Sequence, residues 1–312
     1  MSKTIVNDPP TTAGSRRYST GAVVSKDGTT FGYRQLGRGP GLVVLHGAME
    51  SAASHMQLAE ALADSYTVYL PDRRGRGLSG PYGTPYGVWE DVEDLDALLA
   101  KTGAHGVFGV SSGAIICLEA ALTLPAIQKA AIFEPPLMVD GPAPTAWLTR
   151  FDREMTQGKV AAAMITGMKG AEMGPQMLNL IPRWLLERMT TMMMASEDKK
   201  AGGDDVTMRM LAPTLHYDFQ LVIDMAGPLE RFRAVLAEVL LLGGSKSPAY
   251  LTRAVDALEK VLPDVERVEF LGLGHEASGN ADRRGQPERV AQELRRFFGA
   301  GQNSGTGVTN ND

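Results

Sequence analysis

The chain has 312 residues, of which 44% are hydrophobic and 21% charged, and its formal net charge is -5. This composition is that of an ordinary globular protein and excludes a fibre or a largely disordered chain. The mildly acidic balance, with scattered arginines, argues against a nucleic-acid partner. The length fits one large domain with an insertion.

The N-terminus and the cysteine content bear on the compartment. Residues 1–10 contain no apolar stretch of the kind found in secretory signals. No segment is long and apolar enough to span a bilayer, so we expect no membrane partner. Cys117 is the single cysteine, which excludes an internal disulfide and fits a reducing compartment. We therefore expect a cytoplasmic protein in which Cys117 is a buried packing residue.

Apolar β-branched runs alternate with helical patterns along most of the chain, which is typical of a largely parallel sheet flanked by helices. An opening hairpin is expected at 22–33. The further expected strands are 42–45, 67–70, 106–108, 130–133, 239–244 and 265–271. The expected helices are 51–65, 89–99, the segment after Ser111, 250–262 and 287–298.

The alternation stops after residue 134 and resumes near residue 236. The intervening segment, 135–235, has helical and loop patterns without a clear strand, so we expect an inserted helical cap. The core then comprises 18–134 and 236–298. The polar ends, 1–17 and 299–312, have the composition of disordered segments.

Ser111 stands in a Gly-x-Ser-x-Gly pentapeptide between an expected strand and an expected helix. This context is typical of a nucleophilic serine on a sharp, strained turn, which needs glycine on both sides. At the N-terminus of the helix, free backbone N–H groups stabilise a developing oxyanion. We therefore interpret Ser111 as a catalytic nucleophile.

A serine nucleophile needs a histidine to accept its proton. Among five histidines, His275 follows the last expected strand, where its loop can reach Ser111. His46 and Gly47 follow another strand, as an oxyanion loop would, so the N–H groups of Ala48 and Ser112 are the expected oxyanion donors. The other histidines, His55, His105 and His216, are expected to have structural roles.

Four motifs together resemble the α/β-hydrolase superfamily: His46-Gly47, the Asp72–Ser79 pattern D-x-R-G-x-G-x-S, the Ser111 turn, and Gly274-His275. The resemblance covers about residues 18–298. It implies an α/β fold, with a mostly parallel eight-stranded sheet flanked by helices and a helical cap. It also implies that the Asp72 segment is a structural turn without a catalytic role.

The chain departs from this family at the carboxylate that orients the catalytic histidine. Members most often carry it in a G-x-x-D pattern after the strand that follows the cap, and here Ser247 stands at the aspartate position. A serine cannot stabilise an imidazolium by charge. Glu134, at the end of the strand after the nucleophile's helix, is the natural substitute. One subgroup of haloalkane dehalogenases and zearalenone-type lactonases place their acid there.

Thirteen of the sixteen methionines lie between Met138 and Met225. A methionine-rich lid would suit an apolar substrate of irregular shape, although these side chains could equally fill gaps between short helices. The side chains expected to contact substrate are those of Met49, Trp147, Trp184 and Met192.

The sequence therefore predicts a serine hydrolase that cleaves a carboxylic ester or lactone of a small, apolar substrate without a metal or cofactor. Two alternatives stay open. The same triad could cleave a carbon–carbon bond of a diketone or act as a cofactor-free peroxidase, or the chain could be a ligand receptor on a hydrolase scaffold. The partner is expected to be a small molecule, and the oligomeric state, a homodimer included, is left open.

Overall fold

A computed structural model describes residues 18–139, 141, 145–171, 180–203 and 205–299. The segments expected to be disordered lie outside the described residues, except for Gly299, which ends the last helix. The strands are β1 (Ser19–Val24), β2 (Thr30–Gly37), β3 (Gly41–Leu45), β4 (Thr67–Pro71), β5 (Gly106–Val110), β6 (Lys129–Phe133), β7 (Glu238–Gly244) and β8 (Val265–Phe270).

The helices alternate with these strands and then form a separate group. Those of the core are α1 (Met56–Leu62), α2 (Val88–Thr102), α3 (Ser112–Thr123), α9 (Ala249–Glu259) and α10 (Pro287–Gly299). Those between β6 and β7 are α4 (Leu148–Thr156), α5 (Val160–Gly170), α6 (Arg183–Lys200), α7 (Met208–Leu211) and α8 (Leu215–Asp224). Short 3-10 segments are η1 (Ala52–His55), η3 (Ala212–Thr214), η4 (Leu229–Ala234) and η5 (Ala281–Arg283).

The eight strands form one sheet in the order β1-β2-β4-β3-β5-β6-β7-β8. The pairs β1–β2 and β2–β4 are antiparallel, and all pairs from β4 to β8 are parallel. The expected mostly parallel, eight-stranded sheet is confirmed. Strand order reverses between β3 and β5, and in open α/β sheets the crevice beyond the carboxyl ends at such a point is where ligands bind.

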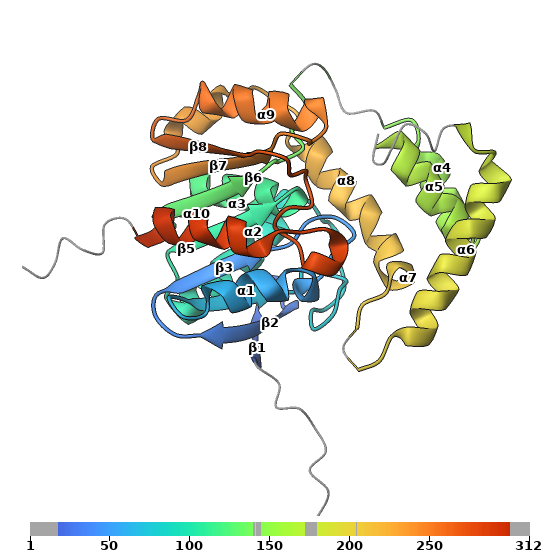
Figure 1. The fold of residues 1–312 in the computed structure, drawn as a ribbon, viewed down its shortest axis with the longest axis horizontal. Helices are drawn as coiled ribbons and strands as arrows, with labels where there is room; N and C mark the ends of the chain where they lie inside the picture. Colours follow the sequence, from blue (N-terminus) through green and yellow to red (C-terminus); the bar gives the residue numbers. More distant parts are fainter. Residues whose placement is uncertain (1–17, 140, 142–144, 172–179, 204, 300–312) are drawn as a thin grey trace, which may run out of the picture.

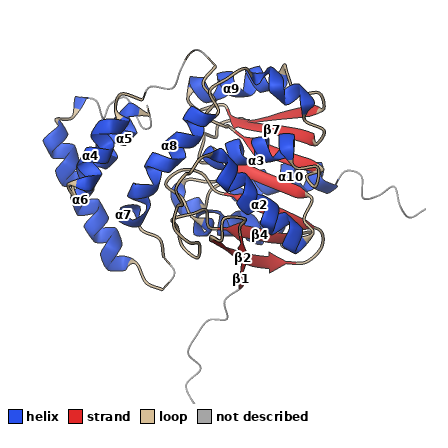
Figure 2. Ribbon diagram, turned by 180° about the vertical axis from the view of Figure 1, so that it is seen from behind, coloured by secondary structure: helices blue, strands red, loops and turns tan. Residues whose placement is uncertain are grey.

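Helices cover both faces of the sheet (Figures 1 and 2). α1 and α10 pack on one face around Leu58, Leu62 and Leu294. α2, α3 and α9 pack on the other, where they meet the alternate side chains of the strands. Both faces are apolar, as buried parallel strands require.

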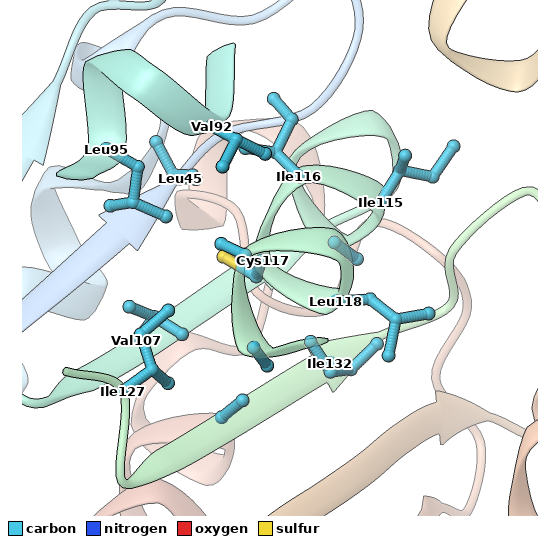
Figure 3. Close-up of a cluster of buried hydrophobic side chains, with 14 of the residues drawn as sticks. Leu45, Val92, Leu95, Val107, Ile115, Ile116, Cys117, Leu118, Ile127 and Ile132 are labelled. Atoms are coloured by element: carbon cyan, nitrogen blue, oxygen red, sulfur yellow. The ribbon is translucent and has the colours of Figure 1, made fainter. Parts of the chain in front are cut away.

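The helix after the Ser111 turn lies in the centre of the second core (Figure 3). Its Cys117 is fully buried, within a cluster that includes Leu95, Val107 and Ile132. Burial raises the pKa of the Cys117 thiol, and the nearby Arg73 charge opposes this only in part. Cys117 is thus a packing residue with no thiolate character, as expected from the sequence.

The helices α4–α7 stand away from the sheet, and α8 lies between them and the core (Figures 1 and 2). Among the described residues between β6 and β7 there is no strand. α8 contacts α3 and α2 on the core side and α4 on the other. No helix in the described ranges combines the length and apolarity needed to cross a membrane.

Candidate active site

Ser111 lies directly after β5 and forms the N-cap of α3. Its backbone has φ 56° and ψ -124°, in the left-handed region that a residue with a side chain rarely adopts. The Ser111 N–H donates to Phe133 O at 2.9 Å, and its carbonyl accepts from Ala114 N at 2.9 Å. The neighbouring strand and the helix therefore hold the strained residue in place.

The two glycines that flank this turn are needed for close backbone approach. A Cβ at Gly109 would lie 2.4 Å from Gly113 O, and a Cβ at Gly113 would lie 2.5 Å from His46 O. These neighbours are backbone atoms and cannot move aside. The pattern Gly-x-Ser-x-Gly thus packs the start of α3 tightly against the ends of β3 and β5.

Glu134 and His275 meet at the same edge of the sheet. Glu134 follows β6, and its Oε2 lies 2.6 Å from Nδ1 of His275. The carboxylate is 1% exposed, whereas the imidazole side chain is 32% exposed. An acceptor at Nδ1 places a proton there and leaves Nε2 free to accept one. The pair therefore has the geometry of a base held by its acid.

The second oxygen of Glu134 is held at the end of β7, just before the segment where the sequence resemblance implies an acid. Oε1 accepts a hydrogen bond from Gly244 N at 2.7 Å, at the end of β7. Ser247, at the missing aspartate position, is partly buried, and its buried Oγ has no hydrogen-bond partner among the described residues. The carboxylate that approaches His275 thus comes from β6, not from the segment after β7.

The two expected oxyanion donors are free. In the described part of the chain, neither the Ala48 N–H nor the Ser112 N–H donates a hydrogen bond to another protein group. The loop that contains Ala48 lies against the Ser111 turn, since a Cβ on Gly47 would lie 3.0 Å from Ser111 Cβ. The structure therefore leaves two donors beside the serine for an oxygen to accept.

His46 is a neutral structural residue. Its Nε2 accepts a hydrogen bond from Arg73 N at 3.1 Å, and its Nδ1 lies 3.0 Å from Gly47 O. These partners require a proton on Nδ1 only. Burial, followed by the charges of Arg76 and Arg73, holds the pKa of His46 well below its ordinary value. His46 therefore joins the Arg73 backbone to the loop that carries the expected donor Ala48.

The described structure contains no hydrogen bond between Ser111 Oγ and His275. Catalytic hydrogen bonds are often long or poorly aligned without substrate and shorten when it binds. The residues that follow β3, β5 and β6 still lie at one edge of the sheet, because these strands are neighbours and end beside one another.

The Asp72 segment forms the expected turn. Asp72 is fully buried, and its carboxylate accepts from Arg34 Nη1 at 2.7 Å, Ala52 N at 2.8 Å and Leu78 N at 3.0 Å. All of its contacts are within the core. The segment joins β2, β4 and η1 beneath the oxyanion loop.

Sequence reasoning missed a buried ion network that joins this segment to α8. Arg73 donates to Ser112 Oγ at 2.9 Å and to Asp218 Oδ1 at 2.7 Å, and Arg76 donates to Asp218 Oδ2 at 2.5 Å. Asp218 is 2% exposed. Burial alone would raise the pKa of Asp218, but the charges of Arg76 and Arg73 lower it below its ordinary value. The sequence feature that could have indicated this network is the pair Arg73 and Arg76, which occupy the two variable positions of the D-x-R-G-x-G pattern.

Two of the four side chains expected to contact substrate lie beside the oxyanion loop. Met49 and Trp147 pack with Ala48 in a small apolar cluster that includes Phe151 and Leu215. Trp147 is also 4.5 Å from Phe219, measured between ring centroids. This cluster packs α4, the first helix of the expected cap, against the loop that contains Ala48.

The other two, Trp184 and Met192, lie on the outside of α6. Their exposed fractions are 66% and 64%. The buried face of α6 is formed instead by Leu186 and Met194, eight residues apart and therefore on one side of the helix. The structure does not bring Trp184 or Met192 to the catalytic side chains.

A cavity of about 600 Å³ separates the end of α6 from η1 and η5. Its lining includes Ser54, Glu197, Lys200, Asn280 and Arg283, and is more polar than the sequence led us to expect. None of the three expected catalytic side chains lines it. Within the described residues, no three His, Cys, Asp or Glu side chains are grouped as a metal site would require.

Known proteins resemble this chain in sequence and in fold. A family model described as the alpha/beta hydrolase family matches residues 42–293. An alpha/beta hydrolase from Sphaerobacter thermophilus has 31% sequence identity and a TM-score of 0.71, over 89% of this chain and 100% of that one. Naproxen esterase from Bacillus subtilis has the same fold at 16% identity and a TM-score of 0.59, over 90% of this chain and 92% of that one.

Curated relatives match more locally. N-formylmaleamate deformylase of Pseudomonas putida is 30% identical over 151 residues, which are 45% of this chain and 56% of that protein. Pimeloyl-[acyl-carrier protein] methyl ester esterase of Xanthomonas campestris is 34% identical over 121 residues, which are 38% of this chain and 46% of that protein. The chain thus spans about half the length of the curated relatives it matches.

Proposed function

This chain belongs to the alpha/beta hydrolase family, and on that basis we propose that it is a serine hydrolase that cleaves a carboxylic ester or lactone of a small, apolar substrate. The observation that carries the proposal is the contact of 2.6 Å between Glu134 and His275, beside a strained Ser111. A binding protein would have no need for a buried carboxylate held against a half-exposed imidazole. The names of two relatives, an esterase and a deformylase, support hydrolysis at an acyl group.

In the proposed mechanism, Ser111 Oγ attacks the substrate carbonyl while His275 Nε2 takes its proton. Glu134 keeps the proton on Nδ1 and stabilises the imidazolium that forms. The N–H groups of Ala48 and Ser112 bind the oxyanion. His275 then gives the proton to the leaving alcohol, and an acyl group remains on Ser111.

Water completes the cycle. His275 takes a proton from the water, the resulting hydroxide attacks the acyl carbonyl, and the second oxyanion occupies the same two donors. Collapse of this intermediate releases the acid and returns the proton to Ser111 Oγ. Met49 and Trp147, packed beside Ala48, are proposed to form the apolar wall for the acyl group. Trp184 and Met192, exposed on the outside of α6, have no part in this proposal.

The reaction uses no metal or cofactor in this proposal, and its partner is a small molecule. The single, buried Cys117 supports action in a reducing compartment, which we propose to be the cytoplasm. We propose no membrane or nucleic-acid partner.

The test is a panel of p-nitrophenyl esters, aliphatic lactones and β-diketones offered to wild type and to Ser111→Ala. We expect the wild type to hydrolyse an ester or a lactone, and Ser111→Ala to lose on the order of 10⁵- to 10⁶-fold in kcat. Cleavage of only the diketones would assign the triad to carbon–carbon bonds. Equal rates for the two proteins would reject Ser111 as the nucleophile.

A further inference from the structure

A second carboxylate lies beside the nucleophile and has no part in the mechanism above. Glu50 Oε2 accepts a hydrogen bond from Gly47 N at 2.8 Å. A Cβ built on Gly47 would lie 3.2 Å from this oxygen and 3.0 Å from Ser111 Cβ. Glu50, the oxyanion loop and Ser111 are therefore immediate neighbours.

The same oxygen of Glu50 is also held by a histidine. His55 is 1% exposed, its Nε2 lies 3.0 Å from Glu50 Oε2, and its Nδ1 lies 3.0 Å from Ser278 O. A carbonyl and an ionised carboxylate can only accept hydrogen bonds. Both ring nitrogens must then carry a proton, so His55 is an imidazolium paired with the Glu50 carboxylate.

Electrostatics agrees with this assignment. Burial alone would lower the pKa of His55, but the charge and hydrogen bond of Glu50 raise it above its ordinary value. Burial alone would raise the pKa of Glu50, but His55 and the Gly47 N–H lower it to about 2, with a further contribution from His46. Arg283, on η5, is the charged group that opposes protonation of His55.

His55 also joins two loops that are far apart in sequence. Ser278, which accepts from it, lies three residues after His275. Asn280 of the same loop donates to Ser54 O at 3.0 Å and to Ala53 O at 2.8 Å. The segment that follows the oxyanion loop is thus fastened to the loop that carries the proposed base.

The loop between Gly47 and Glu50 is a tight turn. Met49 has φ 56°, a strained value for a residue with a side chain. The hydrogen bond from Gly47 N to Glu50 Oε2 closes this turn and fixes the direction of the next N–H, that of Ala48. Without it, the turn has no side-chain acceptor among the described residues.

We propose that Glu50 and His55 form a positioning pair, which holds the oxyanion loop at the orientation needed by the transition state and keeps it aligned with the His275 loop. The proposal rests on the proposed function, since it assigns the Ala48 N–H to an oxyanion. A loop displaced by about 1 Å costs on the order of 10²-fold in rate.

The experiment compares Glu50→Ala, Glu50→Gln and His55→Gln with wild type, with the ester that wild type cleaves fastest. We expect kcat to fall about 10²-fold in Glu50→Ala and about 10-fold in the two Gln variants, with KM within about two-fold of wild type. Affinity for a boronic acid that mimics the oxyanion should fall by the same factor as kcat. Affinity for the product acid should not change.

Asp94→Asn is the matched control. Asp94, on α2, forms a buried ion pair with Arg74, and within the described residues neither side chain is hydrogen-bonded to residues 47–50. We expect it to lower the urea midpoint while kcat and boronic acid affinity are retained. If Glu50→Ala loses stability alone, or loses product affinity in step with kcat, the positioning role is wrong.

Hydrogen exchange separates this outcome from a failure of the proposed function. In His55→Gln, amide exchange should become faster in residues 46–55 and also in residues 271–281, because the pair joins the two loops. This result does not depend on any substrate. Faster exchange in only one of the two segments would overturn the coupling, whereas an inactive wild type with coupled loops would overturn only the proposed function.

Discussion

At the scale of single residues, the carboxylate that contacts His275 is what distinguishes this site. Ser247 stands where family members commonly have aspartate, and Glu134 from the preceding strand contacts His275 instead. The exchange is possible because β6 and β7 are adjacent and parallel, so that their ends meet at one edge. Gly244 N, which Glu134 also accepts from, fixes the carboxylate in this position.

Replacement of Glu134 by Gln tests this role. We expect Glu134→Gln to lower kcat about 10⁴-fold, because an amide can hold the wrong tautomer of His275 and cannot stabilise the imidazolium. The control is Glu276→Gln, on the residue next to His275. Within the described residues the Glu276 carboxylate makes no hydrogen bond to the imidazole, so it should be dispensable. Steady-state kinetics with p-nitrophenyl acetate would decide, and near-normal activity in Glu134→Gln would contradict the assignment.

The Glu50–His55 pair makes a separate prediction about stability and pH. His55 has a raised pKa, so its contribution is complete below its ordinary value of 6.5 and is lost as the pH rises through the raised value. Glu50 has a lowered pKa, so its contribution is complete above 4.5 and is lost as the pH falls towards 2. The pair should therefore stabilise the fold most between pH 4.5 and 6.5.

Urea unfolding of wild type and His55→Gln from pH 5 to pH 10 measures this effect. The difference in unfolding free energy should be largest near pH 5 to 6 and should shrink as the solution becomes alkaline. A difference that is constant over this range would mean that His55 is not charged in the folded protein.

At the scale of elements, the boundaries predicted from periodicity are close to those observed for most of the core. The last helix, expected at 287–298, spans Pro287–Gly299, and the strand expected at 67–70 spans Thr67–Pro71. The helix expected at 51–65 differs, because η1 occupies its first turn before α1 begins. There, Ser54 N bonds to Ser51 O, which is an i to i+3 contact.

Helix α8 lies between the helices α4–α7 and the core, and its Asp218 forms buried ion pairs with Arg73 and Arg76. Asp218→Ala would leave Arg73 and Arg76 buried without their shared carboxylate, so we expect a loss of about 3–5 kcal/mol in unfolding free energy. Asp224→Ala, on the exposed side of the same helix, is the control and should cost much less. Urea unfolding measures both.

Because Asp218 also bonds to Ser112 Oγ at 3.1 Å, its loss should lower the hydrolysis rate of the protein that remains folded. Equal stability of the two α8 variants would mean that the ion pairs of Asp218 with Arg73 and Arg76 stabilise the fold no more than the Asp224 carboxylate does.

At the scale of the whole molecule, the sequence predicts the sheet well because strands and crossover helices have local patterns. The G-x-S-x-G turn and the histidine after β8 are also local signals, and sheet topology places both at the carboxyl edge of the sheet. Contacts between the cap and the core are different. The link between Asp218 and Arg73 spans 145 positions, and no periodicity or motif records it.

The side-chain orientation on the cap shows the same limit. Methionine and tryptophan on α6 have the composition of a binding surface, but which of them face outward depends on how α6 packs against α5. The sequence predicts Met49 and Trp147 from their positions in the expected oxyanion loop and at the start of the expected cap. It predicts Trp184 and Met192 equally well. Only the packing separates the two pairs.

The central claim is that Ser111 carries the acyl group during turnover, and trapping that intermediate tests it directly. Wild type mixed with excess p-nitrophenyl ester, quenched in acid within milliseconds and digested, should yield the acyl mass on the peptide that contains Ser111. Ser111→Ala treated in the same way should yield none. Turnover of the ester by wild type with Ser111 unmodified at every time point, or with the acyl mass on another residue, would contradict the account.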